Sequence, residues 1–461
     1  MNKKIVLIGA GSTSFGPSMM TDLFLSEVLD GSTIVLHDID KEKLHMIFEL
    51  VCKENEKRDQ KFEIEETLDR QEALEDADFI VSSIEVGNRT ELWWQDYKVP
   101  RKHGSTQILG ECGGPGGSFH AWRIIPPILE IIEDVKNICP NAFFINFSNP
   151  MARVCLAIKR AAPNLNFVGL CHQIGFMDKN LPKILDKGLR ESAKTVKGVK
   201  EYKEKFEAQL NKLKMTVGGL NHFAFLFGLE DKDTRENLMP RFNKEALNYF
   251  KENEDRFEFS ALTFEIYKRF KYFPYVGDNH LGEYLQFSEE FTKTQDMKDW
   301  ITRTDQYNKG IYDRVVRYYK RLQKGRYPRK GMLLDTPSGE RAVSIMEAIA
   351  QDKESYETAV NIPNEKIIEN IPKELVRECS ATVDKEGVDG KSLGEKPHDI
   401  AAILRIEAAV QDVCVEAVLQ KSKRLAINCL AIDPNVQEFS QAKGMFEEMT
   451  KKQADYLSYL K

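Results

Sequence analysis

The stretch Ile5-Val6-Leu7-Ile8-Gly9-Ala10-Gly11-Ser12-Thr13-Ser14 decides the fold class of this chain. Its four leading apolar residues indicate a strand that is buried on both faces, as in a parallel sheet. Glycines directly after such a strand permit a tight turn and let a pyrophosphate approach the backbone where the next helix begins. Ser14 stands where the third glycine of the dinucleotide-binding fingerprint is expected. The stretch predicts a dinucleotide site at Gly9, Gly11 and Ser12.

An acidic residue follows the next predicted strand, Ile34–Leu36. Asp38 stands two residues after this apolar run, and a carboxylate there can accept hydrogen bonds from the ribose hydroxyls of NAD. We expect NAD rather than NADP, because an acid rather than Arg or Lys directly follows the strand. The alternative is a glycine-rich turn in a protein that binds no nucleotide, with Asp38 capping a helix.

The pattern of apolar and charged residues along the chain predicts two domains. Up to about residue 170, short apolar runs alternate with helical stretches, which indicates a doubly wound, Rossmann-like α/β sheet. The further predicted strands are Phe79–Ile84, Phe143–Phe147 and Phe167–Leu170, and the helical stretches include Lys41–Glu56 and Ile124–Cys139. Later sequence is charged and helix-prone, with β-type patches at Lys214–Gly219 and Ala359–Val383. We expect an NAD-binding domain over residues 1–195 and an α+β substrate-binding and oligomerisation domain over residues 196–461.

Composition excludes several classes of protein. The 461 residues carry 66 basic and 72 acidic side chains, a formal charge of −6, which provides no electrostatic footprint for nucleic acid. No apolar run approaches the roughly 18–20 residues that span a bilayer. The eight cysteines form no CxxC pair, so we expect a reducing, cytoplasmic setting. Neither nucleic acid nor a membrane is an expected partner.

Polar residues stand at the ends of three predicted strands, where open α/β sheets bind ligands. These are Asn149, the pair Cys171-His172 and the pair Asn221-His222. Cys171 and His222 could give one sulfur and one nitrogen to a divalent metal, which would leave coordination positions for substrate hydroxyls. The alternative is a small buried cysteine and a hydrogen-bonded core histidine.

Two further segments carry candidate residues. Glu111 precedes Cys112–Gly117, which reads as a flexible turn that could close over a ligand. The segment Tyr275–Tyr284 contains Asp278 and His280 and is a reasonable place for a general base. Its alternative reading is a polar turn in which Asp278 begins a helix as the N-cap.

In this order the motifs resemble glycoside hydrolase family 4, the NAD- and divalent-metal-dependent glycosidases, over most of the chain. Five blocks carry the resemblance: Ile8–Ser12, Gly114–Gly117, Asn146-Phe147-Ser148-Asn149-Pro150, Cys171-His172-Gln173-Ile174 and Gly219-Leu220-Asn221-His222-Phe223. Family 4 is an exception to the two-carboxylate scheme of most glycosidases. A histidine at the position of His172, directly after the metal cysteine, resembles the branch of the family that acts on unphosphorylated α-glycosides.

The resemblance implies a role for each candidate. Cys171 and His222 become ligands of Mn²⁺ or another divalent metal, Asn149 and Glu111 bind substrate, and His172 becomes the acid toward the leaving-group oxygen. The base falls in the 275–284 segment, where Asp278 fits best and His280 and Tyr275 are rivals.

The implied reaction is hydrolysis of an α-galactoside, α-glucoside or α-uronide. It proceeds by NAD-dependent oxidation at C3, deprotonation at C2, elimination at C1 and addition of water, with no net redox change. The main alternative is an NAD-dependent hydroxyacid or sugar dehydrogenase with net redox turnover. We expect a small carbohydrate as the substrate and a homodimer or homotetramer as the assembly.

Overall fold

A computed structural model describes residues 2–192, 199–252, 261–292, 297–326, 337–365 and 367–461. Within them the strands join into one sheet of twelve, in the order β3-β2-β1-β4-β5-β6-β10-β11-β7-β8-β9 with β12 beside β11. The expected domain boundary at residue 195 lies outside the described residues. The sheet itself continues from the N-terminal part of the chain into the C-terminal part.

The first six strands of the order form what we call the parallel half. They are β1 (Lys4–Ile8), β2 (Thr33–His37), β3 (Glu63–Thr67), β4 (Phe79–Ser82), β5 (Phe143–Asn146) and β6 (Phe167–Gly169). All of their pairings with one another are parallel, and this confirms the Rossmann-like fold class. The sequence analysis missed β3 because its sequence, EIEET, is acidic and partly exposed at the sheet edge.

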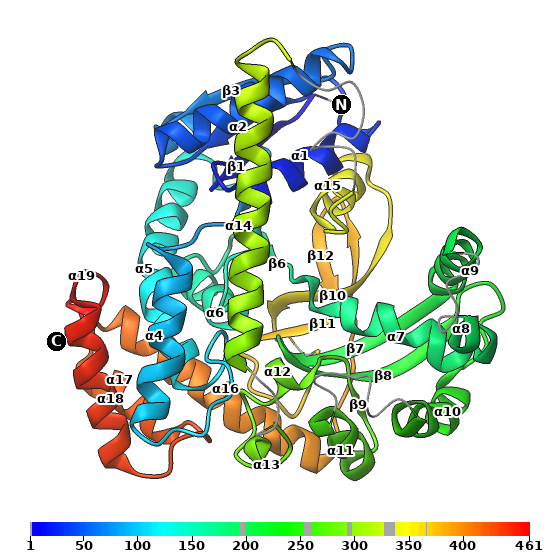
Figure 1. Cartoon of the computed structure of the whole chain (residues 1–461), viewed down its shortest axis with the longest axis vertical. Coiled ribbons are helices and arrows are strands. Elements are labelled where there is room, and N and C mark those ends of the chain that lie inside the picture. Colours follow the sequence, from blue (N-terminus) through cyan, green and yellow to red (C-terminus); the bar gives the residue numbers. More distant parts are fainter. Residues whose placement is uncertain (1, 193–198, 253–260, 293–296, 327–336, 366) are drawn as a thin grey trace.

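The remaining strands form the antiparallel half. They are β7 (Leu213–Leu220), β8 (Phe223–Asp231), β9 (Phe273–Pro274), β10 (Ser355–Pro363), β11 (Val376–Asp384) and β12 (Gly387–Gly390). Strand β10 joins the two halves, since Asn361 pairs with Gly169 of β6. The chain therefore leaves the parallel half after β6 and forms the β7–β8 hairpin. Strands β10 and β11 follow later in the chain and lie between β6 and this hairpin. Figure 1 shows this hairpin projecting away from the parallel half.

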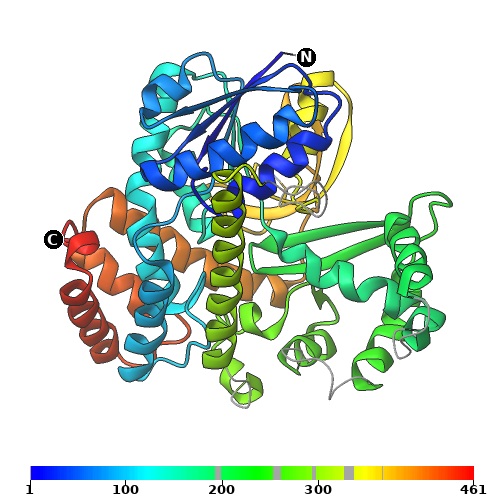
Figure 2. The same cartoon turned by 45° about the horizontal axis from the view of Figure 1, so that its top comes forward.

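Helices cover the parallel half on both faces. Helices α1 (Phe15–Leu25) and α2 (Lys41–Glu56) lie together on one side (Figure 2), and α5 (Gly114–Ile138) and α6 (Met151–Ala161) pack against each other. Helix α16 (His398–Leu419) packs on both α5 and α6, and α18 (Phe439–Lys452) packs on α4 (Arg89–Lys102). The C-terminal helices thus complete the covering of the N-terminal half.

The remaining helices complete the lower and outer parts of the molecule. The long helix α14 (Met297–Leu322) runs along one side and packs against α2 (Figure 1). Beside the hairpin, α7 (Gly175–Leu185) packs against α9 (Val199–Asn211) and α10 (Met239–Glu252). The other helices include α3 (Arg70–Leu74), α8 (Lys187–Ser192), α11 (Ala261–Phe270), α12 (Asp278–Leu281), α13 (Ser288–Thr292), α15 (Ala342–Gln351), α17 (Lys423–Ile432) and α19 (Ala454–Leu457).

The expectation of a flexible turn at Cys112–Gly117 is wrong. Helix α5 already begins at Gly114, and residues 112–117 are all buried. A Cβ on Gly116 would lie 2.7 Å from the carbonyl oxygens of Asp96 and Gly110. The glycines therefore allow close packing of a helix start, and the segment does not form a loop that closes over a ligand.

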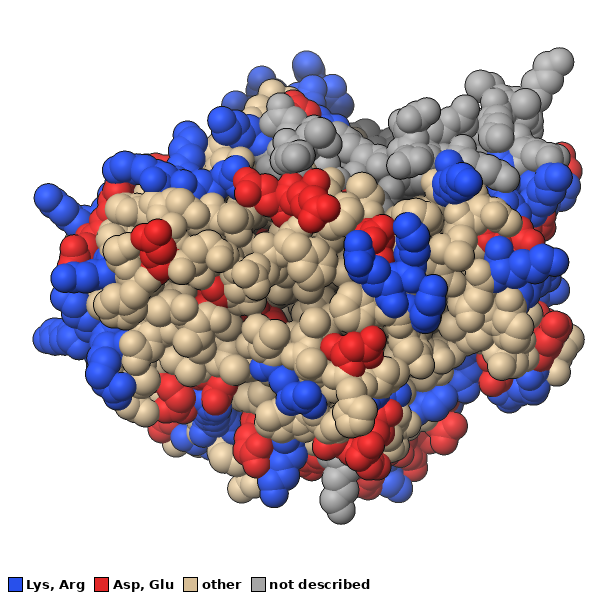
Figure 3. Space-filling view, turned by 90° about the horizontal axis from the view of Figure 1, so that it is seen from below, with Lys and Arg blue, Asp and Glu red and all other residues tan. Residues whose placement is uncertain are grey.

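No helix in the described part of the chain combines the length and apolar character needed to cross a membrane. The face seen from below in Figure 3 has a broad area with few charged side chains left of centre, whereas a group of Lys and Arg and a group of Asp and Glu lie right of centre.

Candidate active site

The glycine-rich turn after β1 is held by backbone hydrogen bonds. Gly9 has a φ of +89°, and its N–H donates to the carbonyl oxygen of His37 at the end of β2, at 2.9 Å. The N–H of Gly11 donates to Oδ2 of Asp38 at 2.9 Å. A carboxylate can accept about four hydrogen bonds, so Asp38 keeps acceptor capacity for a ligand while it orders the turn.

Gly16, two positions after Ser14, allows the close helix packing for which the fingerprint uses its third glycine. A Cβ on Gly16 would lie 2.3 Å from the carbonyl oxygen of Ala10, so α1 can start against the turn only with glycine there. Ser12 also fixes this start, because its Oγ accepts from the N–H of Phe15 at 3.2 Å. The signal was present as a glycine two positions later than the fingerprint places it.

Cys171 and His222 meet, although they are far apart in the chain. Cys171 follows β6, and His222 lies in the turn between β7 and β8. Cys171 Sγ lies 3.4 Å from His222 Nε2. Metal–ligand bonds of about 2.0–2.3 Å place two ligand atoms of one ion roughly 3–3.6 Å apart, so this separation suits a shared ion.

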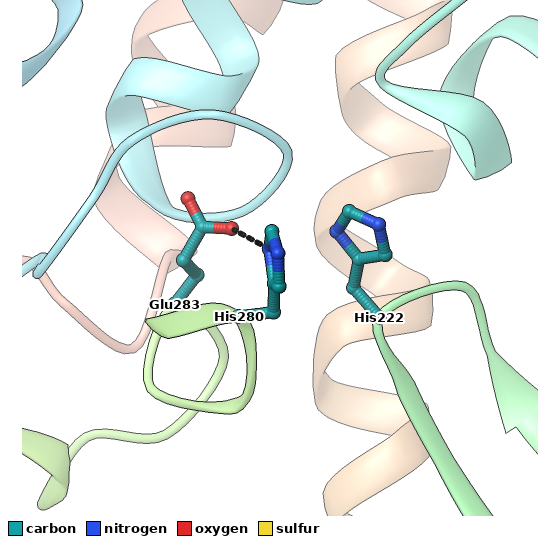
Figure 4. A group of neighbouring side chains, drawn as sticks. All are labelled: His222, His280 and Glu283. Atoms are coloured by element: carbon teal, nitrogen blue, oxygen red, sulfur yellow. Dashed lines mark ion pairs between the residues drawn. The ribbon is translucent and has the colours of Figure 1, made fainter. Parts of the chain in front are cut away.

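His280 and Glu283 extend this pair. The rings of His222 and His280 have centroids 4.2 Å apart, and His280 Nδ1 lies 3.9 Å from Oε2 of Glu283. Figure 4 shows the His280 ring between Glu283 and His222. Nitrogen or oxygen atoms of these three residues lie within 4.8 Å of one another. Glu283 lies within the predicted base segment Tyr275–Tyr284, but nothing in the local sequence marks it out for a role.

Asp278 and Tyr275 face other partners. The carboxylate of Asp278 accepts from the N–H of Leu262 at 2.9 Å and of Thr263 at 2.7 Å, at the start of α11. The hydroxyl of Tyr275 donates to Oε1 of Glu378. Burial, followed by Glu378, raises the pKa of Tyr275 well above its ordinary value. The carboxylate of Asp278 is thus held by the amides at the start of α11 and the hydroxyl of Tyr275 by Glu378, whereas the ring of His280 lies against that of His222.

The remaining candidates, His172, Asn149 and Glu111, come from three different segments. The side chain of His172 is 85% exposed, with Nδ1 3.8 Å from Oε1 of Glu340. Oδ1 of Asn149 is buried and has no hydrogen-bond partner among the described residues. Glu111 pairs through its carboxylate with Arg89 at 2.6 Å, and its N–H donates to Oε1 of Glu283 at 2.6 Å. Glu283 thereby connects the segment before α5 to the histidine cluster.

Burial sets the protonation of the pair. It lowers the pKa of His222 well below its ordinary value, and His280 adds to the effect. It also raises the pKa of Cys171 to about 12, with a further contribution from Glu378. A neutral imidazole is the form that binds a metal, whereas a thiol must lose its proton to do so.

The donor set fits a divalent ion. Cys171 Sγ and His222 Nε2 face each other at 3.4 Å. Nδ1 of the neighbouring His280 is buried without a hydrogen-bond partner in the described chain, and such atoms are rare unless a ligand or water satisfies them. Sulfur and imidazole donors together suit first-row divalent metals. The glycine-rich turn and Asp38 also fit a dinucleotide, because the glycines let a pyrophosphate approach the start of α1 and Asp38 keeps acceptor capacity beside the turn.

The comparisons with known proteins agree with this geometry. Residues 4–187 match the model of family 4 glycosyl hydrolases, and residues 217–436 match the model of the C-terminal domain of that family. The chain is 33% identical to an alpha-glucosidase of Erwinia rhapontici, over 100% of both chains. It is 29% identical to an alpha-galacturonidase of Thermoanaerobacter italicus, over 98% of this chain and 97% of that one.

A solved structure shares the fold. It is that of a 6-phospho-alpha-glucosidase from gut microorganisms in complex with NAD and Mn²⁺, with a TM-score of 0.82. The alignment covers 98% of each chain at 20% identity.

Proposed function

The chain belongs to family 4 of the glycosyl hydrolases, and from this membership we infer that it cleaves α-glycosides of unphosphorylated sugars with NAD and Mn²⁺, or another divalent metal, as cofactors. The observation that carries the proposal is the 3.4 Å separation of Cys171 Sγ and His222 Nε2. It joins two segments that have no local metal motif. The named relatives, an alpha-glucosidase and an alpha-galacturonidase, support the α-glycosidase class.

In this proposal the cofactors would be held at two places. Gly9, Gly11 and Ser12 would present the turn to the pyrophosphate of NAD, and Asp38 would accept from its ribose. Lys43 is paired with Asp40 at 2.7 Å, which supports NAD over NADP because this cation is already engaged. Cys171 and His222 would hold the metal. When bound, NAD supplies reversible hydride transfer at C3 of the sugar, and the metal supplies Lewis acidity.

The chain's own residues would perform the proton transfers. We assign removal of the C2 proton to His280, because its Nδ1 has no hydrogen-bond partner among the described atoms, Glu283 lies 3.9 Å from it, and its ring contacts His222. His172 is exposed enough to reach a leaving group and would protonate its oxygen. The buried Oδ1 of Asn149 would accept from a sugar hydroxyl, and Glu111, whose N–H donates to Glu283, would be a second substrate-binding residue.

The test removes and returns the cofactors. Purified protein is stripped of NAD, treated with EDTA and assayed with nitrophenyl α-glucoside, α-galactoside and α-galacturonide, with the 6-phospho-α-glucoside as comparison. We expect hydrolysis of at least one unphosphorylated substrate only when both Mn²⁺ and NAD are restored. Undiminished hydrolysis in protein shown to be free of NAD would overturn the proposal. Net accumulation of NADH during turnover would indicate a dehydrogenase instead.

We also propose a homodimer or homotetramer. Large apolar side chains are exposed on the C-terminal helices, among them Ile406, which is 50% exposed, and Phe439, which is 61% exposed. Exposed apolar surface of this kind is common where subunits meet. Light scattering at several protein concentrations tests the proposal, and a monomer at all of them would refute it.

A further inference from the structure

A buried carboxylate lies behind the turn that carries His222. Glu378 belongs to β11 and is 1% exposed. It pairs in register with Gly219 of β7, so it stands beside the last residues of that strand. A carboxylate removed from water is costly unless hydrogen bonds satisfy it. Its retention at this position therefore calls for an explanation.

Both oxygens of Glu378 accept hydrogen bonds from the site. Oε2 accepts from Nδ2 of Asn221 at 2.7 Å, and Oε1 accepts from the hydroxyl of Tyr275. No ion pair with Lys, Arg or His within 4.0 Å is present for Glu378 in the described chain. Two of its donors therefore come from the β7–β8 turn and from the segment after β9, and Asn361 of the neighbouring strand β10 also interacts with the carboxylate.

Asn221 directly precedes His222, and His222 has a left-handed φ of +62°. A residue with a Cβ persists in that conformation only when its surroundings hold it there. The side chain of Asn221 is tied to Glu378 on one side of the turn, and Phe223 stacks on Tyr284 on the other, at 5.3 Å between ring centroids. These two contacts fix the backbone on both sides of His222.

We propose that Glu378 is the positioning residue of the metal site: through Asn221 it holds the β7–β8 turn so that His222 Nε2 faces Cys171 Sγ. The inference rests on the proposed metal role of Cys171 and His222. Groups that orient metal ligands without touching the metal typically contribute about 10–100-fold to its affinity.

Glu378→Gln is the informative substitution. A glutamine has the same shape but one acceptor oxygen and one NH₂ group. If its oxygen accepts from Asn221, the Tyr275 hydroxyl must turn and accept from its NH₂ group. The hydrogen bond to Asn221 then joins two neutral groups and is weaker than the bond that a carboxylate accepts. We expect the Kd for Mn²⁺, measured by electron paramagnetic resonance of the free ion, to rise about 10–100-fold. The Kd for NAD should stay within about threefold, because the glycine-rich turn lies in the parallel half.

Glu54→Gln is the matched control. Glu54 is also a fully buried carboxylate, but it lies on α2 and pairs with Arg58. Its substitution should lower the melting temperature without changing the Kd for Mn²⁺. This control separates the general cost of altering a buried carboxylate from a specific effect on the metal site.

Asn221→Ala keeps the test decisive if Glu378→Gln does not fold. It removes the link between Glu378 and the turn and should weaken Mn²⁺ binding in the same direction. The Kd for Mn²⁺ of the double variant, Glu378→Gln with Asn221→Ala, should lie within about twofold of the Kd of the weaker-binding single variant. Both substitutions act through the same contact.

An unchanged Kd for Mn²⁺ in both single variants would overturn this inference alone, provided the wild-type protein binds Mn²⁺. If the wild-type protein binds no Mn²⁺ or other divalent ion, the proposed function fails together with the inference.

Discussion

The parallel and antiparallel halves of the sheet hold their polar groups in different ways. In the parallel half, Gly9, Gly11 and Asp38 lie at one strand-to-helix turn. Hydrogen bonds from the backbone amides of the two glycines hold this turn in place. In the antiparallel half, His222 and His280 come from separate segments and present side chains, and Cys171 reaches them from the end of the parallel half. A site made of backbone is fixed by local conformation, whereas a site made of side chains depends on how distant segments pack.

Substitutions in the Cys171–His222 pair should have the largest effect on activity and should leave the NAD site in the parallel half unaffected. Cys171→Ser and His222→Ala each remove one of the two proposed metal ligands. The Lewis acidity of a metal contributes several kcal/mol to the transition state, so kcat/KM should fall on the order of 10⁴-fold or more. NAD affinity should remain near the wild-type value, because the glycine-rich turn is untouched. Calorimetry of NAD binding and steady-state kinetics measure both quantities.

Cys139→Ser controls for the loss of a buried thiol. Cys139 ends α5 and is 6% exposed, remote in the fold from the His222 turn. It should keep wild-type turnover. Retention of wild-type activity by Cys171→Ser at low Mn²⁺ would refute the two-ligand assignment.

The next largest effect distinguishes His280 from Asp278. Loss of a general base typically costs about 10²–10⁴-fold in rate, and we expect this for His280→Gln. Asp278→Asn should instead lower the free energy of unfolding by roughly 1–3 kcal/mol, because its carboxylate accepts from the amides at the start of α11. Denaturant melts and kcat are measured on both variants. If Asp278→Asn lowers kcat by a similar factor and leaves the free energy of unfolding unchanged, Asp278 rather than His280 is the base.

The difference between a site fixed by local backbone and a site made of distant side chains also explains which features the sequence could predict. The strands of the parallel half, apart from the acidic edge strand β3, are contiguous apolar runs, and Lys41–Glu56 is predicted to the residue as α2. Cys171 and His222 could be singled out because both follow predicted strands, but only the resemblance to a family assigned them to one metal, since no local pattern connects them.

Glu283, Glu378 and Glu340 carry no sequence signal, because their significance depends on residues more than a hundred positions away or on a tertiary contact. The buried start of α5 was misread for a similar reason. Its glycines are required by the approach of Asp96 and Gly110 rather than by loop flexibility.

A smaller effect should come from glycines in two helices. A Cβ at Gly16 of α1 would meet the carbonyl oxygen of Ala10 at 2.3 Å, whereas a Cβ at Gly310 of α14 would have no atom within 4 Å. Gly310→Ala should raise the free energy of unfolding by about 0.5–1 kcal/mol. Gly16→Ala should lower it by about 1–3 kcal/mol through overpacking, and it should weaken NAD binding because Ala10 belongs to the turn. Equal effects of the two substitutions would contradict the close approach of α1.

The smallest effect concerns Asp178 on α7, the helix that leads from the Cys171 segment into the antiparallel half. Burial raises the pKa of Asp178 to about 6, against partial opposition from Arg341 and Lys179. The carboxyl of an unfolded chain titrates near 3.9, so the folded state binds this proton more tightly. The free energy of unfolding must therefore fall as the pH rises from about 4 to about 6, and the penalty is then constant above that range.

Asp178→Asn should remove this pH-dependent loss and stabilise the protein above pH 6 by about 1 kcal/mol, less than the full linkage value because the side chain is partly exposed to water. Urea melts at pH 5 and pH 8 measure it, with the exposed Asp233→Asn as the control. The variant and the wild type should differ more at pH 8 than at pH 5. A gain that is equal at both pH values would show that Asp178 titrates no differently in the folded and unfolded chains, and that the junction between the two halves carries no buried charge.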